Sequence, residues 1–297
     1  MPNLIPSMLI ILIWCLPIGL ATLPILLVEN LSLGVRIAAI MASPMLFIWL
    51  FASVSGLLSL LGQSGIKKGR FARRLFDKIY FRRRLYGTCW TQIYYFKPIY
   101  SVVLSIPLLK WYVLRIFGYR GSCNFTIYPD TWIRDLPILK IGDGAYLSNR
   151  ATIGTNVCMA DGTIFVDSIQ IDRKALIGHL AVLGPGAKVG ENSEIGVGAT
   201  LGIKTRIAKN AKVGVNATVV HGAVVEENAE VGNSCYIGMR ARVSENIKIP
   251  AGTVVPAGTI INTQQDLNQI VHSEERNIGL RTEIAAKALA DALVGGA

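Results

Sequence analysis

The sequence predicts a membrane-spanning helical hairpin followed by an all-β domain, a single-stranded parallel β-helix of about seven coils. The composition is 52% hydrophobic and 16% charged over 297 residues, and a mean hydropathy of +0.45 is too high for an ordinary soluble domain. Two long uncharged stretches stand near the N-terminus. From Ile141 onward an apolar residue recurs at every sixth position.

The uncharged stretches cover residues 4–28 and 37–61. Each exceeds the roughly 20 residues that cross a bilayer. Because only residues 29–36 separate them, we expect a helical hairpin over residues 1–66. The alternative for the first stretch is a cleaved signal peptide, but its apolar run is too long and it lacks a basic flank.

Positive charge is concentrated directly after the hairpin. Residues 67–120 hold 13 Lys or Arg and one acid, Asp77, in a chain of net charge +11. Since basic flanks stay inside, both termini and the β-helix are expected in the cytosol, at the inner (cytoplasmic) membrane. The same charge favours an anionic membrane surface as partner over nucleic acid. Residues 94–119 are rich in aromatics and are expected to lie in the interface, with a re-entrant segment as the alternative.

The hexad pattern defines residues 121–265. All 21 sites from Ile141 to Ile261 are apolar, and Ala is frequent four residues after each. An α-helix cannot keep a six-residue phase on one face, so the pattern predicts a β-helix with three hexads per coil and no interruption. Residues 266–297 form a tail with an amphipathic helix predicted over 281–294.

Stacking at 18-residue intervals places Asp161 directly beneath His179 at the first corner of the prism. A carboxylate orients an imidazole and stabilises its charged form, as a general base requires. His221 stacks between Ile203 and Met239 at the second corner. The five cysteines show no metal-ligand spacing, and the two repeat-borne histidines lie too far apart to share zinc, so no metal is predicted.

The hexads resemble those of the hexapeptide-repeat acyltransferases. The resemblance implies a left-handed β-helix, a homotrimer, and sites in the clefts between subunits. "Ile177-Gly178-His179" and "Val219-Val220-His221" place histidine third in a hexad, where this class often carries its catalytic histidine. Residues 115–235 are also similar to the membrane-embedded terminal region of polylysine-synthetase-like non-ribosomal peptide synthetases. Members tend to carry Gly-Thr-His where this chain has Gly154-Thr155-Asn156.

The expected function is therefore that of a membrane-anchored acyltransferase. It would move an acyl group from a thioester donor, acyl-CoA or an acylated carrier protein, to a hydroxyl or amine of a membrane-associated acceptor. His179 is the predicted base, Asp161 its orienting partner and His221 the alternative base. Lys204 and Arg240 are the candidates for binding the phosphates of CoA. The rival hypothesis is a non-catalytic trimeric scaffold for a peptide-synthesis or polysaccharide system.

Overall fold

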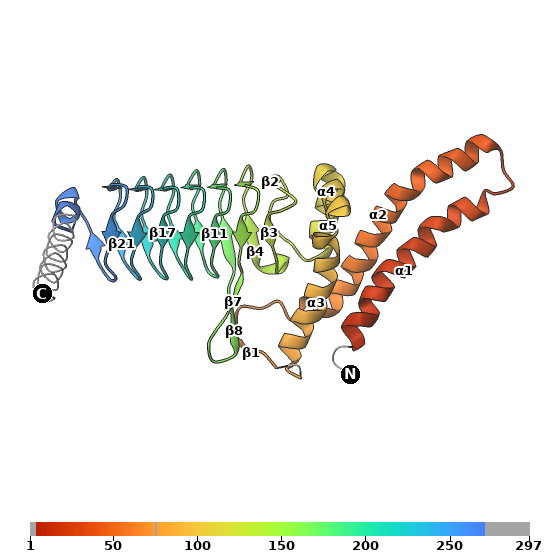
Figure 1. Ribbon diagram of the computed structural model, residues 1–297, viewed down its shortest axis with the longest axis horizontal. Helices are drawn as coiled ribbons and strands as arrows, with labels where there is room; N and C mark the ends of the chain where they lie inside the picture. Colours follow the sequence, from red (N-terminus) through yellow and green to blue (C-terminus); the bar gives the residue numbers. More distant parts are fainter. Residues whose placement is uncertain (1–3, 75, 271–297) are drawn as a thin grey trace, which may run out of the picture.

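The computed structural model describes residues 4–74 and 76–270 (Figure 1). Its N-terminal part contains two helices, α1 (Leu4–Leu27) and α2 (Leu33–Gln63), packed against each other as a hairpin. Both are long and apolar enough to cross a membrane, as the uncharged stretches predicted. Pro17 and Pro24 lie inside α1, and membrane helices tolerate proline where neighbouring groups satisfy the freed backbone.

The basic segment folds onto this hairpin rather than lying flat beside it. It forms strand β1 (Gly69–Ala72) and helix α3 (Lys78–Tyr95), whose first turn is capped by the Asp77 carboxylate accepting from the backbone N–H of Tyr80 at 2.8 Å. Helices α4 (Lys97–Ser105) and α5 (Pro107–Ile116) follow, bent by 113° to each other. The predicted interfacial or re-entrant segment is therefore a sharply bent helix pair, with α5 packed on α2.

The rest of the described chain is a left-handed parallel β-helix built from three seven-stranded sheets (Figure 1). The first sheet contains β2 (Thr126–Ile127), β5 (Tyr146–Leu147), β10 (Leu176–Ile177), β13 (Glu194–Ile195), β16 (Lys212–Val213), β19 (Glu230–Val231) and β22 (Lys248–Ile249). The second contains β3 (Trp132–Ile133), β6 (Thr152–Ile153), β11 (Val182–Leu183), β14 (Thr200–Leu201), β17 (Thr218–Val219), β20 (Tyr236–Ile237) and β23 (Val254–Val255). The third contains β4 (Leu139–Ile141), β9 (Ile169–Ile171), β12 (Lys188–Val189), β15 (Arg206–Ile207), β18 (Val224–Val225), β21 (Arg242–Val243) and β24 (Ile260–Ile261), and the short 3-10 helix η1 (Leu136–Ile138) precedes β4.

Each sheet is followed by a corner, and we number the corners as the sheets. Seven strands per sheet correspond to the predicted seven coils, but the first coil begins at Thr126 rather than at Ile141. The described chain continues as a helix over residues 264–270. The amphipathic helix predicted over 281–294 lies outside the described residues.

The prediction of an uninterrupted prism is wrong at the second coil. There β7 (Asn156–Cys158) and β8 (Thr163–Val166) leave the prism as an antiparallel hairpin, and β1 pairs with β8 to complete a three-stranded sheet. Across this excursion Leu147 pairs with Ile177 and Ile153 with Leu183, a spacing of 30 residues instead of 18. Met159, a predicted core site, is exposed on the hairpin.

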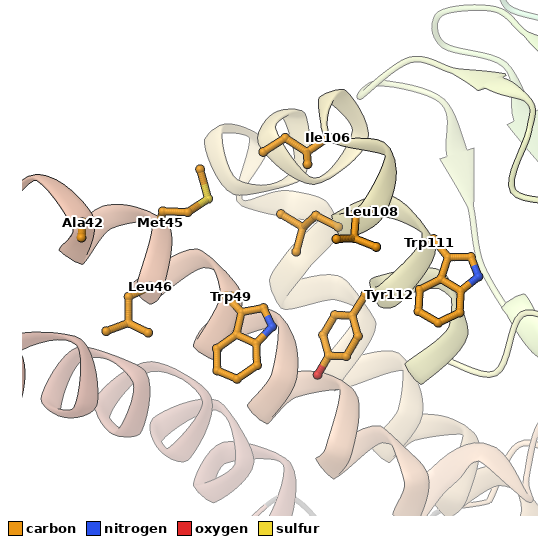
Figure 2. Close-up of a pocket in the computed structure, with 9 residues that line it drawn as sticks. Ala42, Met45, Leu46, Trp49, Ile106, Leu108, Trp111 and Tyr112 are labelled. Atoms are coloured by element: carbon orange, nitrogen blue, oxygen red, sulfur yellow. The ribbon is translucent and has the colours of Figure 1, made fainter.

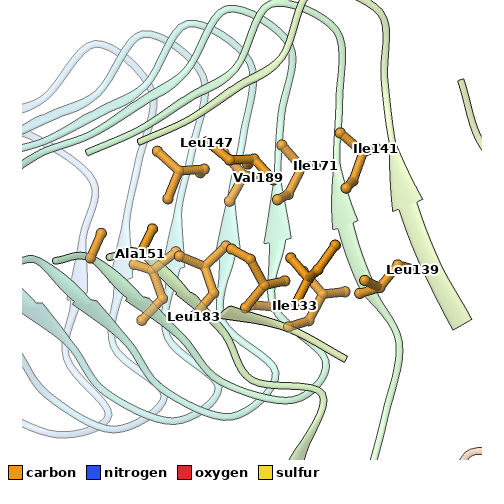
Figure 3. Close-up of a cluster of buried hydrophobic side chains, with 14 of the residues drawn as sticks. Ile133, Leu139, Ile141, Leu147, Ala151, Ile171, Leu183 and Val189 are labelled. Carbon is orange, nitrogen blue, oxygen red and sulfur yellow. The ribbon is translucent and has the colours of Figure 1, made fainter. Parts of the chain in front are cut away.

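In the remaining hexads the apolar side chain at every sixth position points into the core, as predicted. Figure 3 shows Leu147, Ile171, Leu183 and Val189 pointing into the prism together with Ala151. The alanines four residues after the apolar sites are also buried. The fourth position of the hexads has positive φ, and asparagine, which tolerates this conformation, often occupies it. These asparagines are Asn192, Asn210, Asn216, Asn228 and Asn246.

Side chains of residues 67–120, the segment predicted to associate with the membrane, cover the backbone edge of the first coil. Trp90 Nε1 donates to the carbonyl of Ile133 in β3 at 2.8 Å, and Lys110 Nζ donates to the carbonyl of Phe125 beside β2. The Tyr119 hydroxyl donates to the carbonyl of Ile141 in β4 at 3.0 Å and accepts from its N–H at 3.2 Å. Each of the three sheets thus receives one side-chain cap where an edge strand would otherwise leave buried backbone groups unpaired.

A buried ion pair lies at the same junction, the joint between the helices and the first coil. Arg83 of α3 lies 2.7 Å from the carboxylate of Asp135, whose side chain is fully buried, and Thr155 donates to the same carboxylate oxygen at 2.7 Å. Asp135 is held at φ 56°, a backbone conformation that few non-glycine residues adopt. Replacing Arg83 or Asp135 alone would leave the other charge buried and unpaired, which costs about 3–5 kcal/mol, so this contact is sensitive to single substitutions.

Enlarging a buried alanine tests the inward phase. Ala199 is fully buried between coils, so Ala199→Phe should lower stability by about 1–3 kcal/mol or more through overpacking. Thr200→Phe is the matched control, because the neighbouring side chain points outward. Thermal unfolding of the purified protein, followed by circular dichroism, measures both effects. Equal melting temperatures of the two variants would contradict the inward orientation of Ala199.

Removing one cap tests the joint. Burial raises the pKa of Tyr119, so its hydroxyl keeps its proton and donates. Tyr119→Phe removes both bonds to Ile141 and should cost about 1–3 kcal/mol, because a buried backbone group loses its partner. Tyr146→Phe, which removes an exposed hydroxyl bonded to Tyr128, should leave the melting temperature nearly unchanged. An equal effect of the two substitutions would argue against the cap.

Candidate functional site

His179 lies at the first corner of the third coil, directly after β10. Its side chain is half-buried, and no hydrogen-bond or ion-pair partner for the imidazole occurs among the described residues. The preceding Gly178 permits the tight stacking of this corner, since a Cβ there would lie 2.7 Å from the backbone of Gly196 in the next coil. Both ring nitrogens of His179 are therefore free to bind an incoming group.

Asp161 does not lie beneath His179, and the predicted stacking of the two residues is wrong. Because the hairpin raises the spacing to 30 residues, Asn149 occupies the position below, and the carbonyl of Asn149 accepts from the N–H of Leu180 at 3.3 Å. Asp161 lies in the turn between β7 and β8 and forms an ion pair with Arg70 of β1. Hydrogen bonds from Thr163, supported by Arg70, lower the pKa of Asp161.

Asn149 is a candidate that the sequence analysis missed. Its side-chain oxygen Oδ1 is buried and has no hydrogen-bond partner among the described residues. An amide oxygen accepts from an imidazole N–H, so Asn149 supplies an acceptor one coil below His179. The signal that would have found it is "MADGT", an Asp-Gly turn between two β-rich runs, which is typical of a hairpin.

His221 lies at the second corner of the fifth coil and is exposed. The strand register places it between Ile203 and Met239, as predicted. Its Nδ1 accepts from the backbone N–H of Ile203 at 2.9 Å. In the neutral ring Nε2 then carries the proton, so His221 in this arrangement is a hydrogen-bond donor rather than a base.

Lys204 and Arg240 lie on the same corner as His221, one coil below it and one coil above. Both occupy the positive-φ position of their hexads, with φ values of 55° and 56°. The Lys204 ammonium lies 5.5 Å from the ring centroid of Phe165 on the hairpin. Neither cation has a carboxylate partner among the residues the structure describes, so both are free to contact an anionic group.

The face between the first and second corners carries no charge in its strands. Its outward side chains in the described chain are uncharged at every strand: Trp132, Thr152, Val182, Thr200, Thr218, Tyr236 and Val254. The other two faces each carry Lys, Arg or Glu at four of their seven strands. Exposed Leu180, Val197 and Val215 extend the uncharged surface along the corner of His179. This surface suits apolar ligands or another protein rather than bulk water.

No protein-family model matches the chain, and no curated protein matches it. Solved structures similar to it include the acetyltransferase domain of PglB from Neisseria gonorrhoeae, with 20% identity over 31% of this chain and 45% of that chain and a TM-score of 0.31. Perosamine N-acetyltransferase from Caulobacter crescentus has 19% identity over 50% of this chain and 59% of its own, with a TM-score of 0.28. The UDP-N-acetylglucosamine O-acyltransferase LpxA from Moraxella catarrhalis has 18% identity over 49% of this chain and 65% of its own, with a TM-score of 0.30.

These solved structures are acyltransferases of the hexapeptide-repeat class, the class that the hexads resemble. The chain spans less than two thirds of each. At such low TM-scores and identities the likenesses carry no argument about activity. The similarity to polylysine-synthetase-like enzymes stays a prediction.

Proposed function

We propose that this protein is a membrane-anchored acyltransferase that moves an acyl group from a thioester to a hydroxyl or amine of a membrane-associated acceptor. The observation that carries the proposal is the half-buried imidazole of His179, which has no partner in the described chain and borders the uncharged face of a hexapeptide β-helix. A free imidazole beside an apolar surface suits a base that acts on a bound, partly desolvated substrate.

In this mechanism His179 removes the proton from the acceptor as its oxygen or nitrogen attacks the thioester carbonyl. The new C–O or C–N bond forms, the tetrahedral intermediate collapses, and the C–S bond breaks. The leaving thiolate then takes the proton from the imidazolium, which restores the neutral base. Asn149 Oδ1 would accept from the other ring N–H and position the imidazole, the role first assigned to Asp161.

The height of His179 favours a membrane-associated acceptor. It lies two coils above the first coil, about 10 Å at the usual strand spacing. The first coil contacts α3 and α5 through its caps, so a substrate anchored in the bilayer has a short distance to cover. His221 lies four coils above the first, about 19 Å away, and is less accessible to such a substrate.

The donor would be acyl-CoA or an acylated carrier protein. Lys204 and Arg240, two coils apart on the second corner, remain the proposed contacts for its phosphates. In a homotrimer, which we also propose, the uncharged face would be buried between subunits, so that the first corner of one subunit approaches its neighbour. The basic residues after α2 would face anionic lipid on the cytosolic side.

Single substitutions separate the candidate residues. His179→Ala should reduce turnover by about 10²–10⁴-fold, the usual effect of removing a positioned base. Asn149→Leu should reduce turnover less, and it should also shift the pH-rate profile, because the imidazole loses its acceptor. Asp161→Asn and His221→Ala are the matched controls and should stay near wild-type activity.

Intact-mass detection of acylated product, with a panel of acyl-CoAs and lipid acceptors, measures these variants. Full activity of His179→Ala would end the proposal for this residue. A selective loss in His221→Ala would move the site to the second corner. Absence of product from the folded wild-type protein with every donor would instead favour the non-catalytic scaffold, for which the uncharged face would be the docking surface.

The proposed topology has its own test. Phe76 is 88% exposed in the segment after α2, and Leu31 is 54% exposed in the turn between α1 and α2. In a background without the native exposed cysteines, Phe76→Cys should resist a membrane-impermeant thiol reagent added to intact cells. Leu31→Cys should react, because the turn faces the other side. The reverse pattern would overturn the cytosolic placement of the β-helix.

A further inference from the structure

A polar pocket of about 400 Å³ lies where the membrane-associated segment meets the base of the third sheet. It is distinct from the apolar groove of Figure 2, which lies between α2 and the bend of α4 and α5 and is lined by residues such as Met45 and Trp49. The polar groups of the pocket are those of Lys68, Arg120, Lys140, Ser168, Gln170 and Asp172.

Positive charge exceeds negative charge in this pocket. Lys140 projects outward from β4, and Arg120 is exposed in the loop after α5. Neither has a carboxylate partner among the described residues. Lys68 approaches Asp167 only at 3.8 Å with 60% of its side chain exposed, an arrangement that holds the cation weakly. The pocket therefore offers several N–H donors to a bound anion.

The pocket is also well ordered by its surroundings. Arg115 donates to the carbonyls of Tyr119 and Gly121 at 2.9 and 3.0 Å and so fixes the loop that carries Arg120. Gln170 donates to Asp172 at 2.8 Å, which engages the one carboxylate of the pocket. Lys140 is thus presented on a strand and Arg120 on a braced loop, so less conformational entropy is lost when a ligand binds.

The position of the pocket matches the headgroup level of a bilayer. Lys68 follows shortly after the end of α2 at Gln63, and Arg120 follows shortly after the end of α5 at Ile116. If α2 crosses the membrane, the chain leaves the hydrocarbon region after Gln63, shortly before Lys68. Cations there meet the phosphates of anionic lipids, each with a gain of about 1 kcal/mol.

We propose that this pocket binds the phosphate of an anionic phospholipid headgroup and so fixes the base of the β-helix on the membrane surface. Lys68, Arg120 and Lys140 would donate to the phosphate oxygens, and Ser168 would supply a hydroxyl. The proposal rests on the membrane placement proposed above but not on acyl transfer.

Native mass spectrometry of the full chain in detergent, titrated with phosphatidylglycerol, tests this site. Each cation removed should weaken binding of the first lipid about fivefold, so Arg120→Gln with Lys140→Gln should weaken it about 25-fold. Arg206→Gln with Lys212→Gln removes the same two charges from exposed sites outside the pocket and should retain wild-type affinity. Equal affinity of both double variants would overturn the proposal.

Competition identifies the source of the phosphate. Neither CoA nor millimolar inorganic phosphate should displace phosphatidylglycerol from the wild-type protein. Displacement by CoA would assign the pocket to a soluble donor, and displacement by inorganic phosphate would reduce it to a general anion site; either result contradicts the lipid proposal. His179→Ala should bind lipid normally, so failure of acyl transfer and failure of this site are distinguishable.

Discussion

The backbone edge of the first coil has to be satisfied, and the rest of the structure depends on how this is done. A β-helix pairs each coil with the next, but its first coil has no coil below. Here Trp90, Lys110 and Tyr119 each supply a side-chain hydrogen bond to one of the three sheets at that end. The membrane-associated segment therefore acts as the N-terminal cap of the prism, and a cap cannot move away without exposing unpaired backbone groups. The buried pair of Arg83 and Asp135 ties α3 to the same coil.

The contacts between the helical segment and the first coil set the distance of the candidate site from α3 and α5. Since the caps hold the first coil against α3 and α5, the height of each corner residue follows from its coil number. His179 lies near the first coil, and its imidazole has no partner in the described part of the chain, whereas the Nδ1 of His221 already accepts a backbone N–H two coils further along the prism. These differences are the basis for proposing His179, rather than His221, as the base. The cationic pocket beside the joint would hold the same end of the prism against lipid headgroups.

The periodic part of the fold could be predicted from sequence because each hexad site repeats one local requirement. An apolar side chain fills the prism, a small residue such as alanine is buried four residues later, and the positive-φ position at the corner is most often Asn or Gly. The partner of His179 could not be predicted in the same way. The hairpin inserts two hexads' length and keeps the six-residue phase, so Met159 and Phe165 fit the pattern while lying off the prism.

The caps escaped prediction for a different reason. Tyr119 belongs to the segment predicted to be interfacial, and Trp90 lies in the basic segment before it. Only the tertiary fold brings their polar atoms to carbonyls of distant strands. In the sequence Arg83 is likewise one of many basic residues in the segment 67–120, although in the structure its guanidinium is buried against Asp135. Local patterns specify the coils, but the contacts between the membrane segment and the first coil join residues far apart in sequence.

Amide hydrogen exchange of the full chain in lipid nanodiscs tests the joint most directly. If the membrane-associated segment caps the prism, amides in residues 126–141 should exchange as slowly as those of the central coils, such as residues 195–213. The N–H of Ile141, bonded to the Tyr119 hydroxyl, should be among the protected ones. Rapid exchange throughout 126–141 beside a protected centre would show that the first coil is an open edge, and would contradict the account.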